Sequence, residues 1–324
     1  ANLATSHGIN ISGGSVSLTY LGNISKGNLG ALINVSGGHT GTLTFNTGTL
    51  SATNGSGLQF DNADGTYNFN GTTTLNGGDA GIDILAGADA VAGSTGTFTF
   101  GTGTSITRAN SVSGEAFNLA GSDANVTYSG SMSLGTSTGN MIAISDHDAG
   151  IITFQTGTLT KGILAGANAT QGISVSNSNG GTINFNGPIV IFMSTANAVS
   201  LTTNTGGVMN FAGGLALTTT SGTGFNATGG GTVNVCDENP CGASGTNGAL
   251  VNTIATTTGT AINVNATTIG SSNLEFKSVS ANGGTNGVVL NNTGSGGLKV
   301  KGDGTLARNG TGGTINNTSG DAVQ

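Results

Sequence analysis

The stretch GTLTF at residues 41–45 returns as GTYNF at 65–69, GTFTF at 96–100 and GTINF at 181–185. Looser copies of this phrase end at Leu18, Tyr128, Phe154, Phe211, Val235, Phe276 and Val300. Successive copies lie 24 to 31 residues apart, with one longer step of 41 residues between Val235 and Phe276. A repeat of this period is typical of solenoids, propellers and other repeat arrays.

Each repeat predicts three short strands. A small residue and alternating apolar positions precede the phrase, as in Gly81-Ile82-Asp83-Ile84, and another apolar residue follows it, as at Leu75. Each strand type resembles its counterpart one period away better than its sequence neighbours, which favours stacked coils over hairpins. We therefore predict an all-β fold: one continuous parallel β-helix (β-solenoid) over residues 1–324. It has about 11–12 rungs of three short strands, and it is right-handed by analogy with most three-faced β-helices.

The aromatic residue that ends the phrase predicts a stacked column inside the solenoid. Aromatic burial is the largest single source of stability that this composition offers. The predicted core ladder consists of Phe45, Phe69, Phe100, Tyr128, Phe154, Phe185, Phe211 and Phe276.

Composition excludes several other classes of protein. Gly supplies 61 of 324 residues and Pro only 2, and charged residues make up 6% where about 25% is usual. Gly, Thr, Asn and Ser are poor helix formers, so a helical bundle is excluded. The net charge of −7 argues against nucleic acid and anionic membranes as partners. No apolar stretch is long enough to cross a bilayer, so we expect no membrane insertion.

Two stretches, TAINVNATTIG at 260–270 and NNTGSGGLKV at 291–300, resemble the large β-strand-repeat surface proteins of Gram-negative bacteria. These are similar to autotransporter passengers and filamentous-haemagglutinin-like β-helix adhesins. The resemblance implies an extracellular protein at the bacterial cell surface, with a host or matrix surface as partner. It brings no shared catalytic motif, and it implies that the remainder of a longer rod is another partner.

Cys236-Asp-Glu-Asn-Pro-Cys241 lies inside the longest step of the repeat, which predicts an inserted loop over residues 236–259. A disulfide between Cys236 and Cys241 fits an oxidising compartment. A free pair of thiols, or two ligands of a metal site, are the alternatives. This loop is the best place in the sequence for a specific contact.

Asp146-His147-Asp148 is the only compact cluster of metal-ligand types, and Asp123 lies one rung before it. Hard oxygen ligands at a turn can hold Ca²⁺, which makes Asp146, Asp148 and Asp123 candidate ligands. A solvated acidic turn is the alternative. The sequence predicts no other metal and no cofactor. Asp83 has Gln59 and Asn118 as rung neighbours rather than a second carboxylate, so we expect no enzyme.

Three functions remain open. A secreted or cell-surface adhesive solenoid, acting through weak multivalent contacts, fits the neutral composition best. A filament subunit that stacks on copies of itself through its end rungs is the first alternative, because Ser319–Gln324 copies the start of the repeat at Ser113–Asn118. The second alternative is an ice-binding solenoid, because outward positions such as Thr42, Thr66 and Thr97 predict a threonine column.

Overall fold

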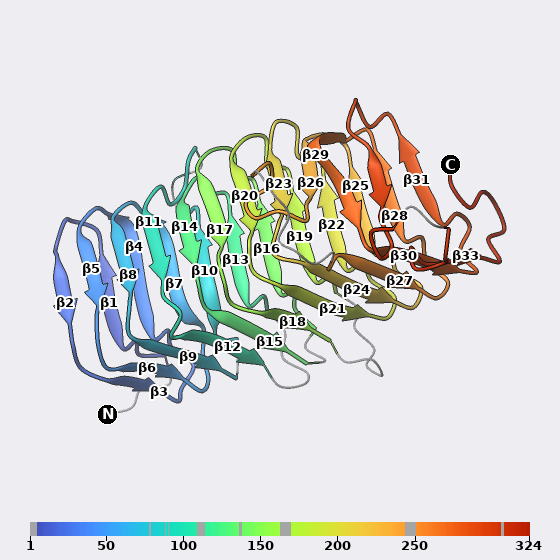
Figure 1. The fold of residues 1–324 in the computed structure, drawn as a ribbon. Helices are drawn as coiled ribbons and strands as arrows, with labels where there is room; N and C mark the ends of the chain where they lie inside the picture. The colour runs from blue at the N-terminus through green and yellow to red at the C-terminus, as the bar shows by residue number, and fades with distance from the viewer. Residues whose placement is uncertain are drawn as a thin grey trace. The chain divides into compact units, whose positions relative to one another are not determined.

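The computed structural model describes residues 5–77, 79–87, 89, 91–108, 114–135, 138–162, 170–243, 251–305 and 308–324. Every regular element among these residues is a β-strand, 33 in all, and the strands pair in parallel (Figure 1). No described segment forms a helix that could span a bilayer. The chain divides into two compact units, Ala1–Thr158 and Leu159–Gln324. Both coil through three sheets with three strands per turn, which confirms the predicted parallel β-solenoid.

In the first unit, strands of each sheet lie side by side with every third strand of the chain as neighbour (Figure 1). Its first sheet contains β1 (Ile9–Ser12), β4 (Ile33–His39), β7 (Gly57–Ala63), β10 (Gly81–Leu85), β13 (Phe117–Ala120) and β16 (Ile142–Ser145). Its second sheet contains β2 (Leu18–Tyr20), β5 (Thr42–Phe45), β8 (Thr66–Phe69), β11 (Thr97–Phe100), β14 (Asn125–Tyr128) and β17 (Ile151–Phe154). Its third sheet contains β3 (Ile24–Lys26), β6 (Thr49–Ala52), β9 (Thr72–Asn76), β12 (Thr104–Arg108) and β15 (Ser131–Leu134).

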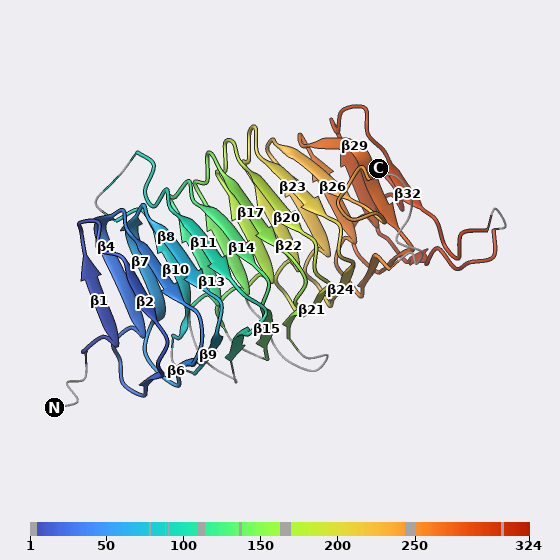
Figure 2. The same ribbon diagram turned by 60° about the vertical axis from the view of Figure 1, so that its left-hand side comes forward.

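The second unit repeats this arrangement (Figure 2). Its first sheet contains β19 (Ile173–Ser176), β22 (Val199–Thr202), β25 (Phe225–Thr228), β28 (Ile262–Asn265) and β31 (Val288–Asn291). Its second sheet contains β20 (Thr182–Phe185), β23 (Val208–Phe211), β26 (Thr232–Val235), β29 (Thr268–Phe276) and β32 (Leu298–Val300). Its third sheet contains β18 (Leu159–Lys161), β21 (Ile189–Met193), β24 (Leu215–Thr219), β27 (Thr253–Thr256), β30 (Ser278–Asn282) and β33 (Ile315–Asn316).

The aromatic ladder fills the interior of the second sheet. Phe45 pairs with Phe69, and Phe69 with Phe100, on successive strands, and their ring centroids lie 4.9 and 5.2 Å apart in stacked geometry. In the second unit Phe185 stacks on Phe211 at 4.6 Å. Stacking follows from the parallel register, since like residues stand one strand spacing apart. All eight residues of the predicted ladder are buried: Phe45, Phe69, Phe100, Tyr128, Phe154, Phe185, Phe211 and Phe276.

Two ends of the ladder differ from the prediction. The first copy of the phrase ends at Tyr20 rather than Leu18, because Tyr20 is the residue that pairs with Phe45. In β29 the register shifts, so that Val235 pairs with Leu274 and Phe276 pairs with Val300. The extra residues of this bulged strand place Phe276 two positions farther along the strand than Leu274, the residue that pairs with Val235, which a count of spacings does not reveal.

The corner after the first sheet uses residues in the left-handed conformation. Asn62, Asp146, Asn177, Thr203 and Asn292 have φ between 52° and 56° at this corner on different coils. Asn and Asp tolerate this region better than most residues because their side chains hydrogen-bond locally. On these five coils the chain therefore turns toward the second sheet through a left-handed residue.

Candidate functional site

The predicted Ca²⁺ ligands lie at the corner after β16. The Oδ1 atom of Asp123 accepts hydrogen bonds from the backbone N–H groups of Asp148 (2.8 Å) and Ala149 (2.9 Å) of the next coil. Asp146 is the left-handed corner residue, with φ 52°. Among the described residues, Asp123, Asp146 and Asp148 do not form a group of three ligand atoms within 4.8 Å. Asp123 therefore serves to join two successive turns.

His147 lies between these carboxylates in sequence but points into the interior. Its side chain is fully buried, and its Nδ1 atom lies 2.8 Å from the carbonyl oxygen of Ser122. Burial lowers the pKa of His147, although the hydrogen bond to Ser122 opposes this effect. The imidazole of His147 therefore belongs to the core, whereas Asp146 and Asp148 are exposed at the surface. The three residues are adjacent in sequence but do not form one site.

Asp83 has the neighbours that the repeat register predicts. Asp83 pairs with Gln59 on one side and with Asn118 on the other. The Gln59 amide donates to one carboxylate oxygen of Asp83, and Asn118 donates to the other at 3.1 Å. Burial raises the pKa of Asp83, while these two hydrogen bonds lower it. The sequence therefore predicted this local arrangement of side chains correctly.

Cys236 and Cys241 are joined by a disulfide that closes a loop directly after β26. The backbone N–H of Cys236 donates to Phe211 (2.9 Å), and the Asn239 side chain donates to the Asn186 carbonyl at 2.9 Å. These bonds hold the ring on the preceding coil. The carboxylate of Glu238, inside the ring, accepts the N–H of Gly242, the residue directly after the ring, at 2.9 Å.

The insertion predicted over residues 236–259 is shorter than expected. Residues 253–256 form β27, which pairs in parallel with β24 and β30 as a regular strand of the third sheet. Residues 244–250 lie outside the described part of the chain. The bulge in β29 lengthens the spacing between Val235 and Phe276. For this reason the repeat spacing places residues 253–256 in the insertion, although they form a regular strand.

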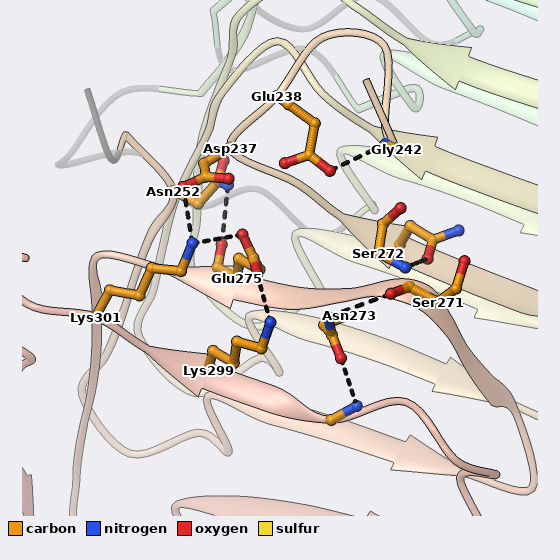
Figure 3. Close-up of polar contacts among 12 residues, drawn as sticks. Asp237, Glu238, Gly242, Asn252, Ser271, Ser272, Asn273, Glu275, Lys299 and Lys301 are labelled. Carbon is orange, nitrogen blue, oxygen red and sulfur yellow. Dashed lines mark hydrogen bonds and ion pairs between the residues drawn. The ribbon is translucent and has the colours of Figure 1, made fainter. Parts of the chain in front are cut away.

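A cluster of charged side chains surrounds the disulfide loop (Figure 3). The Nζ atom of Lys301 lies 2.8 Å from Asp237 Oδ2 and 2.6 Å from Glu275 Oε2. Lys299 reaches the other oxygen of Glu275 at 3.0 Å. Asp237 and Glu275 are buried, whereas both lysines keep part of their stems in solvent. The loop after β26, strand β29 and the end of β32 thus meet at Lys301.

The pKa shifts in the cluster follow from the Lys301 ammonium group, which contacts both Asp237 and Glu275. Burial by itself would raise the pKa of Asp237, but the hydrogen bond and charge of Lys301 outweigh it and lower this pKa to about 2. Burial would lower the pKa of Lys301, and its contacts with Asp237 and Glu275 reverse this and raise it. Both groups are therefore charged over the whole physiological range, and they neutralise each other.

Asn252 lies next to Asp237 and bonds the backbone beside the two buried carboxylates (Figure 3). This side chain is 1% exposed, and its Nδ2 atom donates to the carbonyl oxygens of Cys236 and Glu275, both at 2.9 Å. Its Oδ1 atom accepts the backbone N–H of Leu215 at 2.9 Å. One buried amide thus joins the disulfide loop, β29 and β24, and it positions the backbone of both buried carboxylates.

Asp237, Glu238 and Glu275 have carboxylate oxygens within 4.8 Å of one another, which is the spacing of a cation site. The ammonium of Lys301 already stands between Asp237 and Glu275 and supplies a compensating charge. A cavity of about 210 Å³ beside the disulfide is lined by Asp237, Asn239 and Val251, among others. The arrangement can therefore fasten three chain segments together and present a polar recess next to the loop.

Sequence reasoning placed the loop but not its charged partners. Glu275 and Lys299 could have been found, because they stand 24 residues apart at equivalent positions of neighbouring repeats. Lys301 and Asp237 are 64 residues apart and share no periodic relation. No sequence feature distinguishes Asn252 from the many other asparagines of the chain, so its role could not be predicted.

The outward faces carry ladders of amide side chains. On the second sheet, Asn234 donates to Asn210 and Asn210 to Asn184, both at 2.9 Å. On the first sheet, Asn263 donates to Asn226 at 2.8 Å. Each amide bonds its neighbour on the adjacent coil, so these stretches of the two faces are polar and uncharged. Much of the hydrogen-bonding capacity of the amides is used within the ladders.

The chain matches no protein-family model, no curated protein and no solved structure in the three comparisons. The relation to autotransporter passengers or haemagglutinin-like adhesins therefore stays an expectation from sequence. What the structure supports is the more general class: the chain is a β-helix repeat protein with a disulfide-closed, charge-compensated loop on its second unit.

Proposed function

We propose that this chain is a non-catalytic adhesive solenoid that is secreted or displayed at a bacterial cell surface. The observation that carries the proposal is the repetition of equivalent uncharged amide groups on successive coils, as in Asn184, Asn210 and Asn234. Identical weak contacts at regular spacing gain strength by multivalency. The disulfide between Cys236 and Cys241 supports an oxidising compartment.

The test is retention of the purified full chain on immobilised matrix proteins and polysaccharides. Asn210→Glu places a charge in the middle of the ladder, and Asn179→Glu places the same charge on an exposed corner of the same unit. We expect retention to fall for Asn210→Glu and to stay at the wild-type level for Asn179→Glu, with circular dichroism showing an unchanged fold. Equal retention of both variants would argue against the ladder as the adhesive face.

The non-catalytic part of the proposal has its own test. Polysaccharides of plant and bacterial origin are incubated with the chain, and new reducing ends or unsaturated products are measured. Turnover that persists in the purified chain would replace adhesion by an enzymatic function. Thermal hysteresis of a concentrated solution checks the ice-binding alternative in the same way, since an adhesive solenoid produces none.

A filament subunit is the second candidate, and a separate observation favours it. Val323 forms a parallel bridge with Val288, and the N–H of Leu290 donates to the carbonyl of Gln324 at 2.9 Å. Residues 322–324 thus add to β31 in the register of a further coil. Parallel addition of this kind is how a solenoid extends. Negative-stain electron microscopy separates the two candidates: long filaments support polymerisation, and discrete particles support the single adhesive solenoid.

A further inference from the structure

A hollow of about 750 Å³ lies beside the loop that connects β32 to β33, and its described lining residues run from Val300 to Gly313. Figure 2 shows this loop extending away from the strands. The volume is within the range of ligand sites, about 300–1,000 Å³. Lys301, which also belongs to the charged cluster, stands at one side of the hollow. The hollow and the disulfide loop are therefore neighbouring parts of one surface.

The charged side chains among the described lining residues of the hollow are both basic. Its described lining contains Lys301 and Arg308 and no carboxylate, in a chain with only 7 basic residues against 14 acidic ones. Lys301 is already paired with Asp237 and Glu275. Arg308 is exposed and takes part in none of the ion pairs among the described residues. Arg308 is therefore the lining cation that no ion pair among the described residues occupies, and the one carboxylate of this loop, Asp303, bonds Thr305 and Asn309 instead.

The polar groups of the loop are held in place by one another. The Asp303 carboxylate accepts the N–H and hydroxyl of Thr305 (3.0 and 2.7 Å) and the Asn309 amide (2.6 Å). The hydroxyl of Thr311 donates to Asn309 at 2.7 Å. The oxygen of Thr311 also accepts the N–H of Asp303 at 3.0 Å, and that of Thr305 accepts the Asn309 amide at 3.4 Å. Each hydroxyl therefore offers a ligand one remaining acceptor lone pair. The strong free donor is the Arg308 guanidinium.

We propose that this hollow binds a carboxylated saccharide, such as a uronic acid unit of an acidic polysaccharide. The sugar hydroxyls donate to Thr305 and Thr311, which line the hollow, and the carboxylate pairs with Arg308. The planar guanidinium fork matches a carboxylate through two parallel hydrogen bonds. The proposal rests on the adhesive function above and names the ligand class of that function.

The experiment is calorimetric titration of the full chain with an oligogalacturonate and with its neutral methyl ester. Wild-type protein should bind the acid at least about 10-fold more tightly than the ester, and Arg308→Gln should weaken binding of the acid about 10-fold. Lys277→Gln is the matched control, because Lys277 is an exposed lysine of a neighbouring segment that does not line the hollow. It should change the affinity by less than about 2-fold.

Three results would overturn this inference: no binding of the acid, equal binding of the acid and the ester, or an Arg308→Gln affinity equal to that of wild type. Displacement of the saccharide by equimolar acetate would also do so, because the site would then recognise a simple anion. The retention assay keeps the two proposals apart. Retention that survives in Arg308→Gln refutes only the hollow, whereas a wild-type chain that no surface retains refutes the adhesive function itself.

Discussion

Replacing Asn252 by Ala should destabilise the second unit more than replacing any of the ladder asparagines. The Asn252 amide is 1% exposed and makes three hydrogen bonds of 2.9 Å to backbone groups of Leu215, Cys236 and Glu275. Alanine keeps the backbone of Asn252, which bonds Lys277, but removes all three side-chain bonds. The backbone groups that lose their partners lie where water does not readily replace them.

The magnitude follows from the kind of group that is left unpaired. The two bonds that Asn252 donates are worth about 1 kcal/mol each, and a buried N–H without an acceptor at Leu215 costs about 1–3 kcal/mol. The expected loss in free energy of unfolding is therefore about 3–5 kcal/mol. Asn210→Ala is the matched control: the half-buried Asn210 amide bonds two other side chains at the surface, and its loss should cost less than about 1 kcal/mol.

Hydrogen exchange of the intact chain measures this effect locally, which suits a repeat protein whose coils contribute separately to stability. Amides of β24, β27 and β29 should lose protection in Asn252→Ala, and those of β8 and β11 in the first unit serve as an internal reference. Urea unfolding gives the total change. A destabilisation below about 1 kcal/mol, equal to that of Asn210→Ala, would refute the view that this amide supports the site.

Three further predictions concern the core, the charged cluster and the disulfide. Phe69→Ala should cost about 3–5 kcal/mol in thermal or urea unfolding, because the ring is fully buried and stacks 4.9 Å from that of Phe45 and 5.2 Å from that of Phe100; a loss below about 1 kcal/mol would contradict the ladder as the main source of stability. Since the pKa of Asp237 is lowered to about 2 in the folded chain, its stabilising contribution is present above about pH 4 and is lost as the pH falls toward 2. Urea titrations at pH 7 and pH 3 should therefore show a smaller acid-induced loss for Lys301→Met than for wild type, and an equal loss would argue against the ion pair. Reduction of the disulfide, which spans 5 positions of sequence, should lower stability by about 2 kcal/mol in the chain-entropy estimate; unchanged exchange in the loop after β26 under reductant would count against it.

The repeat determined most of the fold because parallel coils place each residue over its equivalent. Phe45, Phe69 and Phe100 recur at near-constant spacing, and in the structure they pair residue for residue. The same reasoning placed Gln59 and Asn118 beside Asp83. Where the repeat spacing is regular, the sequence pattern is enough to predict which residues are neighbours, because residues on adjacent coils are one repeat apart in sequence.

The candidate site lies where the period fails. The bulge in β29 shifts Phe276 by two positions, and this irregularity also brings Glu275 toward the loop that follows β26. Arg108 is a similar case: a residue that composition would leave in solvent is 1% exposed and donates to the carbonyl oxygens of Gly114 and Glu115. Neither arrangement could be predicted from the hydropathy pattern or from the repeat spacing.

The sequence by itself determined that the chain is a parallel solenoid with three strands per turn, and which strand of each repeat carries the aromatic ladder. These properties depend on the alternation of apolar and polar residues within a strand and on the repeat period, and both can be observed directly in the sequence. Only the tertiary structure decided that Cys236 and Cys241 are bonded and that Lys301 joins Asp237 to Glu275. It also decided that Asn252 bonds the backbone of Glu275 and that Asp123 bonds the backbone of Asp148. Such contacts depend on how an insertion and a bulge fold back between coils, which no single repeat encodes.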